Sequence, residues 1–205
     1  MEDRIQKTMD NLRLNKMKAY YVESREVLYN IVRELVKNDS LITAGGSMTL
    51  KECGVIDLLK TEFSNAFLDR SSGKNRADVE EIMRKAFVSD TFFASTNAVT
   101  ENGELYNVDG NGNRVSAMIF GPGQVIIIAG VNKIVKNLDE ARERVEKIAA
   151  PKNTVRLEKA TPCVKTGKCE HCRSDDRICC SYVTLAQQRV PDRIKVILVN
   201  ENLGY

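Results

Sequence analysis

The chain has 205 residues, of which 42% are hydrophobic and 29% are charged, as in an ordinary soluble globular protein. This composition excludes a disordered or collagen-like chain, and no apolar run approaches the roughly 20 residues of a membrane span. The amino-terminal segment is charged and lacks an apolar signal core, so we expect a cytoplasmic protein. The net charge of +3 is too small to predict nucleic-acid binding.

Positive charge and cysteine are both concentrated toward the carboxyl terminus. Residues 151–205 contain 10 Lys and Arg against 6 Asp and Glu, whereas the rest of the chain is nearly neutral. Five of the six cysteines lie within residues 163–180. Because no secretion signal is present, disulfides are not expected, and the clustered thiols indicate metal or redox chemistry.

Helical and extended patterns alternate along most of the chain. The apolar spacing predicts helices at residues 1–14, 24–36, 49–60, 75–87, 113–120 and 137–150, and strands at residues 17–22, 41–44, 91–94, 104–108, 125–129 and 196–199. Thr49 with Glu52 forms a capping box that is expected to open the third helix. Pro151 is expected to end the last helix, and the polar stretch between residues 94 and 104 is expected to be a loop.

This alternation predicts the fold class and the domain organisation. Strands separated by helices favour an α/β fold with a mainly parallel sheet flanked by helices. We find no internal repeat or linker, so residues 1–205 are expected to form a single domain. Residues 151–182 are expected to form a cysteine-rich, loop-like excursion within that domain.

Two segments that follow predicted strands are candidates for anion binding. In the turn at residues 45–49, glycine lets a ligand approach closely, and free N–H groups at the start of the next helix favour an anion. The candidate anion-binding residues of this turn are Gly45, Gly46, Ser47 and Thr49. The alternative is that these residues form a plain tight turn without a ligand. Lys133 follows the most apolar strand, where open α/β sheets bind ligands; the alternative is a surface lysine.

The polar stretch at residues 96–114 contains two further charged candidates. Glu101 is either a nucleophile or general base, if burial raises its pKa, or a solvated residue of a hairpin turn, which Glu-Asn-Gly also favours. Arg114 lies near the start of a predicted helix, where the helix dipole disfavours a cation. We therefore expect an anionic partner for Arg114, either Asp109 or a ligand.

The strongest motif is Cys163-x5-Cys169-x2-Cys172-x6-Cys179. A Cys-x2-Cys pair offers two thiolates to one metal from a single turn, and two flanking cysteines complete four sulfur ligands. The interleaved Lys and Arg residues would offset the negative charge of a four-thiolate site. Zinc and an iron–sulfur cluster both fit this ligand set. The alternative is a group of reduced thiols or a reversible disulfide.

A series of longer motifs runs in order along the chain. They are GGSMTLKECGV, STNAVTENGELYNVDGNGNRVSAMIFGP, VIIIAGVNKIV, AAPKN, TPCVKTGKCEHCRSDDRIC and ILVNENLGY. From about residue 10 onward the chain thereby resembles the LUD-domain family of lactate-utilization proteins. The resemblance implies the NagB/RpiA/CoA transferase-like fold, shared by ribose-5-phosphate isomerase, glucosamine-6-phosphate deaminase and the CoA transferases. Members of that superfamily bind phosphorylated sugars or CoA esters at loops that follow the strands.

The resemblance also bears on individual residues. The turn at residues 45–49 is similar to the superfamily's anion-binding turn. The stretch Thr100-Glu101-Asn102-Gly103 looks like the Ser-Glu-Asn-Gly motif of class I CoA transferases, whose glutamate forms an acyl intermediate, with Thr100 in place of serine. The chain lacks the ferredoxin-type cysteine runs of the family's iron–sulfur component, and it looks more like the small single-domain members.

These observations lead to one main hypothesis and two alternatives. The chain is expected to bind a small anionic metabolite (a 2-hydroxy acid, a sugar phosphate or a CoA ester) with a four-cysteine metal site for redox work and a redox protein partner. One alternative is an acyl-CoA or sugar-phosphate enzyme that uses Glu101, and the other is a non-catalytic, metal-stapled sensor or regulatory subunit. No nucleic-acid or membrane partner is expected, and a homo-oligomer is left open. We expect the glycine turn, Glu101 and Lys133 to meet in one cleft roofed by the cysteine segment.

Overall fold

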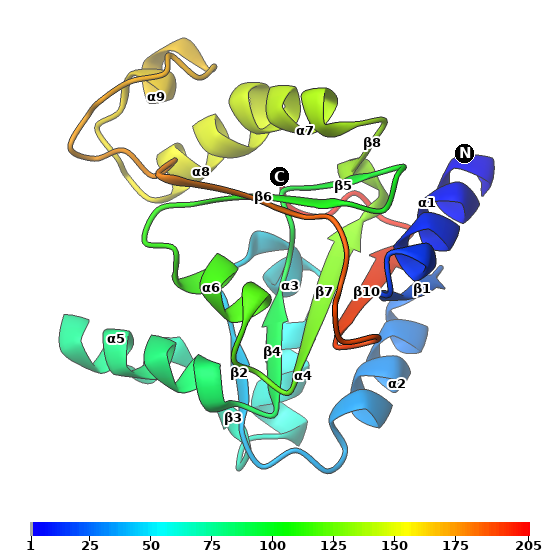
Figure 1. The fold of residues 1–205 in the computed structure, drawn as a ribbon. Coiled ribbons are helices and arrows are strands. Elements are labelled where there is room, and N and C mark those ends of the chain that lie inside the picture. Colours follow the sequence, from blue (N-terminus) through cyan, green and yellow to red (C-terminus); the bar gives the residue numbers. More distant parts are fainter. Residues whose placement is uncertain (1) are drawn as a thin grey trace.

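A six-stranded parallel sheet forms the centre of the structure, a computed structural model that describes residues 2–205 (Figure 1). Its order is β1 (Lys18–Val22), β10 (Ile194–Val199), β7 (Gln124–Gly130), β4 (Thr91–Ala94), β2 (Ile42–Ala44) and β3 (Phe67–Leu68), and every neighbouring pair is parallel. The predicted α/β fold with a mainly parallel sheet is therefore confirmed.

Both faces of this sheet are covered, which explains why its strands are almost wholly apolar. Along β7, Ile127 and Ala129 face the side on which α1 (Glu2–Leu14) and α6 (Asn113–Ile119) pack. Ile126 and Ile128 face the opposite side. That side is covered by α2 (Arg25–Val36), α3 (Met48–Glu52) and α4 (Val55–Glu62). Successive side chains of β7 therefore pack in two different hydrophobic cores, because the side chains of a strand alternate between its faces.

A second, smaller sheet lies above the carboxyl ends of the first. Its order is β8 (Ile134–Val135), β5 (Ala98–Thr100), β6 (Leu105–Asp109) and β9 (Ser181–Leu185). It packs on a third core with α7 (Leu138–Arg144), the π-helical turn η4 (Val145–Ala149) and α8 (Ala150–Arg156). Residues 101–103 form the turn of a β5–β6 hairpin, so the expected loop between residues 94 and 104 contains a short strand.

The remaining elements are short or project from the sheets. They are η1 (Arg70–Ser72), α5 (Arg76–Lys85), η2 (Ala86–Val88), η3 (Val131–Lys133) and α9 (Pro162–Thr166). Helix α5 extends away from the central sheet (Figure 1), and none of its residues is buried. Helix α9 and strand β9 give regular structure to part of the segment that was expected to be loop-like. None of the described helices is long and apolar enough to cross a membrane.

Three local predictions are wrong for identifiable reasons. Ser47, not Thr49, caps the third helix, because its side chain accepts a hydrogen bond from the backbone N–H of Leu50. That helix is also broken in two at Gly54, whose φ of 77° is left-handed. Pro151 does not end its helix, since it lies in the first turn of α8 directly after the wider π-helical turn η4. Because α7, η4 and α8 form one continuous helical run, Pro151 removes one N–H from it, and the carbonyl oxygen of Glu146 accepts instead from the backbone N–H of Cys169 at 2.8 Å.

Candidate functional site

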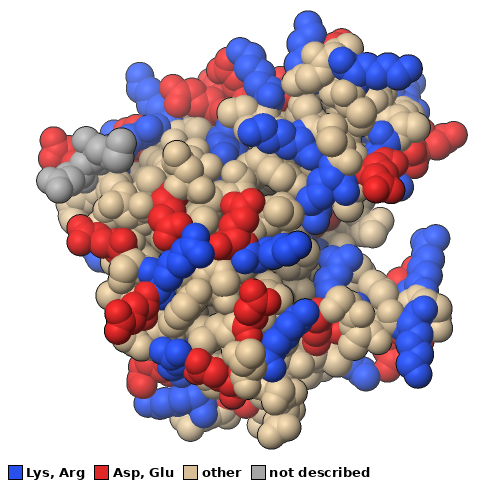
Figure 2. Space-filling model, turned by 180° about the vertical axis from the view of Figure 1, so that it is seen from behind, with Lys and Arg blue, Asp and Glu red and all other residues tan. Residues whose placement is uncertain are grey.

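A cavity of about 670 Å³ opens at the carboxyl ends of β2, β4 and β7. The cavity is lined from the central sheet by residues 46–49, residues 95–97 and Lys133, which lie in the segments that come after β2, β4 and β7. Arg76 of α5 and residues 175–178 of the cysteine segment line it from the other side. Figure 2 shows the surface hollowed between these two projecting parts. Open parallel sheets bind their ligands at this edge.

Lys133 is the most deeply buried charged group of the cavity, with a relative exposure of 3%. Its Nζ lies 2.8 Å from Oγ1 of Thr49, 3.0 Å from Oγ of Ser95 and 3.2 Å from the carbonyl oxygen of Thr96. These acceptors come from the segments that follow β2 and β4. The prediction that Lys133 and the glycine turn share one cleft therefore agrees with the geometry.

The surroundings of Lys133 disfavour its charged form. Burial, followed by the positive charges of Arg144 and Arg114, lowers the pKa of Lys133 to about 7. Within the described residues, no carboxylate lies at ion-pair distance from its Nζ. Near neutral pH, Lys133 is therefore present in both forms: it attracts an anion when protonated and accepts a proton when neutral.

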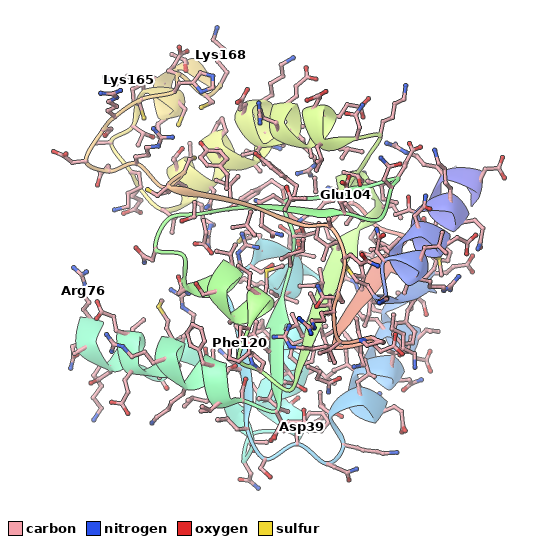
Figure 3. The ribbon with its side chains drawn as sticks, in the orientation of Figure 1. Asp39, Arg76, Glu104, Phe120, Lys165 and Lys168 are labelled. Carbon is pink, nitrogen blue, oxygen red and sulfur yellow. The ribbon has the colours of Figure 1, made fainter. Side chains whose placement is uncertain are left out.

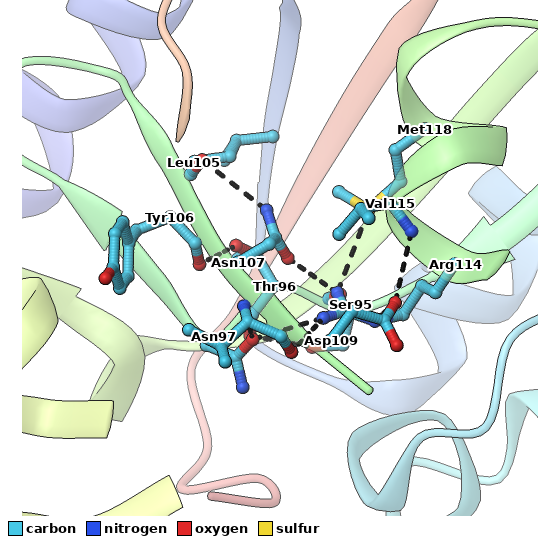
Figure 4. A network of polar contacts seen from close by, with 11 residues as sticks. Ser95, Thr96, Asn97, Leu105, Tyr106, Asn107, Asp109, Arg114, Val115 and Met118 are labelled. Atoms are coloured by element: carbon cyan, nitrogen blue, oxygen red, sulfur yellow. Dashed lines mark hydrogen bonds and ion pairs between the residues drawn. The ribbon is translucent and has the colours of Figure 1, made fainter. Parts of the chain in front are cut away.

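Arg114 forms the centre of a polar network at the cavity wall (Figure 4). Its Nη1 donates to the carbonyl oxygen of Ser95 at 2.8 Å and to Oδ1 of Asn107 at 2.5 Å. Its Nη2 donates to Oδ1 of Asn97 at 3.2 Å, and its Nε lies 3.6 Å from a carboxylate oxygen of Asp109. The expected anionic partner of Arg114 is thus Asp109. The network fixes a positive charge at the wall of the cavity and holds the backbone of Ser95.

The glycine turn brings one further cation to the cavity. A Cβ on Gly46 would lie 2.8 Å from Nη1 of Arg70, so the guanidinium rests directly against this glycine. Gly45 lies behind the wall, where a Cβ would be 3.3 Å from both Arg114 and Phe92. Gly46, Ser47 and Thr49 line the cavity, whereas Gly45 is not one of its lining residues.

Cationic side chains outnumber acidic ones around the cavity. In the described part of the chain, the lining cations are Arg70, Arg76, Arg114, Lys133, Arg156, Lys159 and Arg177, and the lining carboxylates are Asp109, Asp175 and Asp176. Ser95 was not predicted from the sequence, although this residue directly follows the predicted strand at residues 91–94. The expectation that ligands bind beyond the ends of strands, which singled out Lys133, applies to Ser95 as well. Arg70 and Arg156 were not predicted either, and no local pattern gives a signal for them.

Glu101 lies outside this cavity. It is in the β5–β6 turn, and its carboxylate pairs with Nε of Arg4 at 2.8 Å and Nζ of Lys7 at 3.0 Å. These two cations of α1, with Lys7 contributing most, lower the pKa of Glu101. Figure 3 shows Glu104, at the same end of the hairpin, on the α1 side of the molecule and away from Arg76. The expected meeting of Glu101 with Lys133 and the glycine turn is not observed.

The four cysteines of the predicted metal motif lie in one neighbourhood. Burial raises the pKa of Cys179 to about 11, and the nearby thiols of Cys169, Cys163 and Cys172 contribute to that rise. The backbone N–H of His171 points at Sγ of Cys169 at 3.4 Å. Among the described residues, however, no three His, Cys, Asp or Glu side chains are arranged so that they could hold a metal ion.

Arg177 ties parts of the cysteine segment to one another, and the backbone N–H of Cys180 ties the segment to the carbonyl oxygen of Asp109 at 3.0 Å. The Arg177 guanidinium donates to the carbonyl oxygens of Cys179 at 2.8 Å and Cys172 at 2.6 Å. Arg177 and Cys180 both line the cavity, whereas the four motif cysteines do not. The cysteine segment therefore contributes to the cavity wall through its backbone and its other side chains.

The parallel sheet and its cationic cavity define an α/β protein with a candidate ligand site at the carboxyl edge. A profile of the LUD domain family matches residues 5–199, and the chain belongs to this family. A DUF162 family protein from Deinococcus radiodurans has a similar fold, with a TM-score of 0.56, 13% identity and 97% of each chain covered. Chaetomium thermophilum eIF2B beta matches with a TM-score of 0.29 and 17% identity over 65% of this chain and 43% of its own. No curated protein matches the sequence.

Proposed function

We propose that the chain binds a small anionic metabolite in the cavity at the carboxyl ends of β2, β4 and β7. The surplus of cations around this cavity supports the proposal. Two of its three carboxylates are already paired, Asp109 with Arg114 and Asp176 with Lys159. A cleft lined by one sign of charge concentrates ions of the opposite sign.

Arg70 is the side chain best suited to make direct contact with the anion. Within the described residues its guanidinium has no carboxylate at ion-pair distance, and it rests against Gly46 at the mouth of the turn. A planar guanidinium binds carboxylate and phosphate groups through two parallel hydrogen bonds. The cavity volume of about 670 Å³ falls within the range of metabolite sites and exceeds what a 2-hydroxy acid alone would fill. A sugar phosphate or a CoA ester is the better match.

Titration calorimetry at low ionic strength tests this proposal with L-lactate, ribose 5-phosphate and CoA as probes. At least one probe is expected to bind, and Arg70→Gln is expected to weaken it at least about tenfold, or about 1.4 kcal/mol. Arg84→Gln is the matched control, because Arg84 is exposed on α5 and does not line the cavity. Absence of binding by all three probes, or equal loss in both variants, contradicts the proposal.

We also propose that the cysteine segment binds one metal centre. Its ligands would be Cys163, Cys169, Cys172 and Cys179. The shared neighbourhood of these thiols supports this, as does the turn in which the His171 N–H donates to Sγ of Cys169. Because no three ligands stand ready in the described chain, the sulfurs would have to move together as the metal binds. Zinc would make the centre structural, whereas an iron–sulfur cluster would add electron transfer.

Elemental analysis of anaerobically purified protein tests the metal proposal. We expect either about one zinc per chain or iron with a brown colour. Cys172→Ser is expected to lose the metal, and Cys180→Ser, a change at the neighbouring cysteine outside the motif, is expected to keep it. Metal-free protein that binds neither added zinc nor a reconstituted cluster would exclude this centre.

A further inference from the structure

A serine and a lysine stand side by side at the floor of the cavity. Ser95 is the first residue after β4, and Lys133 follows β7, which is the neighbour of β4 in the sheet. Parallel pairing of these strands brings the two side chains together, with Oγ of Ser95 3.0 Å from Nζ of Lys133. Both residues line the cavity, so a bound molecule can reach this pair.

Nζ of Lys133 faces three oxygen atoms, which suit either the three N–H donors of the protonated amine or the two N–H donors and one lone pair of the neutral amine. The carbonyl oxygen of Thr96 can only accept, and it takes one N–H. The Thr49 hydroxyl donates to the carbonyl oxygen of Leu203 at 3.3 Å, so it accepts the second N–H of Lys133. The third position faces Ser95: the protonated amine donates to Oγ of Ser95, whose hydroxyl donates to the carbonyl oxygen of Thr96 at 3.4 Å. When Lys133 loses its proton, its lone pair lies within reach of the Ser95 hydroxyl proton.

We propose that Ser95 is a nucleophile and Lys133 its general base, so that the cavity is a site for acyl transfer from an ester or thioester that carries an anionic group. The choice of an anionic substrate rests on the proposed function above, whereas the Ser95–Lys133 pair rests on its own geometry. A hydroxyl is a weak nucleophile until a positioned base removes its proton, and serine–lysine pairs are one arrangement that does so.

The reaction proceeds in two balanced stages. In the first, Oγ of Ser95 bonds to the acyl carbon while its proton passes to Nζ of Lys133. The bond from the acyl carbon to the leaving oxygen or sulfur then breaks, and the leaving group takes that proton. In the second stage, water adds to the acyl–serine ester and gives a proton to Lys133. The carboxylic acid leaves, and Ser95 recovers its proton.

Neighbouring residues hold this pair in position. Thr49 orients the amine of Lys133, and Nη1 of Arg114 holds the backbone carbonyl of Ser95 at 2.8 Å. The nearby charges of Arg114 and Arg144 favour the neutral amine that the reaction requires. The same fixed charges stabilise negative charge that develops on an acyl oxygen in the cavity.

Active-site labelling of the full chain tests the proposal. A fluorophosphonate, which modifies activated serines, is expected to add about one label per chain, and peptide mass spectrometry should locate it on Ser95. Ser95→Ala should remove the label and Lys133→Met should slow labelling at least about 100-fold. Ser64→Ala, a change at an exposed serine outside the cavity, should label like the parent chain.

The pH dependence of the parent chain provides a measurement that needs no variant. The labelling rate is expected to rise as pH increases through about 7, because only neutral Lys133 accepts the Ser95 proton. Absence of label on Ser95, or a rate that neither pH nor Lys133→Met alters, overturns the proposal. The anion affinity of the parent chain separates the two ideas: anion binding without labelling of Ser95 leaves the proposed function standing, and labelling without anion binding leaves only the Ser95–Lys133 pair.

Discussion

Replacing Lys133 with methionine should change how the stability of the protein depends on pH. The pKa of Lys133 is about 7 in the folded chain, against an ordinary value of 10.5. Between these values the unfolded chain binds a proton that the folded chain does not, so stability rises with pH across this window. Below pH 7 Lys133 is charged in both states, and the full cost of burying the charge is present. That cost is about 5 kcal/mol, at about 1.4 kcal/mol per unit of pKa difference.

Urea unfolding of the parent chain and Lys133→Met at pH 7, 8 and 9 measures this effect. The free energy of unfolding of the parent minus that of the variant is expected to increase by about 1 kcal/mol from pH 7 to pH 8, where Lys133 is still partly protonated in the folded chain, and by about 1.3 kcal/mol from pH 8 to pH 9. The variant also loses the hydrogen bonds to Thr49, Ser95 and Thr96, but this loss is the same at every pH. Other titrating groups are common to both chains and cancel in the difference.

A difference that stays constant from pH 7 to pH 9 would refute this reasoning. It would mean that Lys133 keeps its proton in the folded chain throughout this range. Lys133 would then be a permanent cation of the cavity, and it would have no lone pair to accept the Ser95 proton. The same titration therefore bears on the stability argument and on the proposed acyl-transfer chemistry.

Three further predictions follow from local geometry. Gly54→Ala should cost more than about 1 kcal/mol in urea unfolding, because φ is 77° there and a Cβ would collide with the Tyr29 hydroxyl. With a thiol reagent, exposed Cys180 should react first, whereas Cys53, whose burial raises its pKa to about 11, should react only on unfolding. Glu101→Gln should leave anion affinity unchanged in calorimetry, and a loss above about tenfold would place Glu101 in the binding site.

Sequence patterns predicted most of the central sheet because its strands carry strong local signals. Residues 125–129 are apolar throughout, as required of a strand covered on both faces. Because ligands of open α/β sheets bind beyond the carboxyl ends of the strands, this strand also predicted the position of Lys133 at the cavity. Strands β3, β5 and β8 contain two or three residues, too few for any periodicity, and the equally short β2 was predicted only because it precedes the glycine turn. Their pairing is decided by tertiary contacts that a local pattern does not contain.

Lys133 lies in the cavity as predicted and Glu101 does not, and this difference has a geometric origin. Both belong to polar segments near strand ends, but the stretch that contains Glu101 folds into a hairpin. The chain leaves the cavity at Asn97 and returns to it at Val108, so the turn between them lies at the far end. Arg70 and Arg156 reach the cavity from η1 and α8, whose positions depend on how whole elements pack.

The π-helical turn η4 has a consequence for how α8 meets the cavity. A π turn holds one more residue than a turn of α-helix, and each residue of an α-helix advances the chain by about 100° of rotation and 1.5 Å. The π turn at 145–149 widens the helix and absorbs the extra residue, so α8 keeps nearly the rotation it would have after an uninterrupted α-helix that is one residue shorter. Asn153 and Arg156 consequently face the cavity. Inserting a further residue into α8 before Asn153, where no bulge absorbs it, would instead turn both side chains away from the cavity.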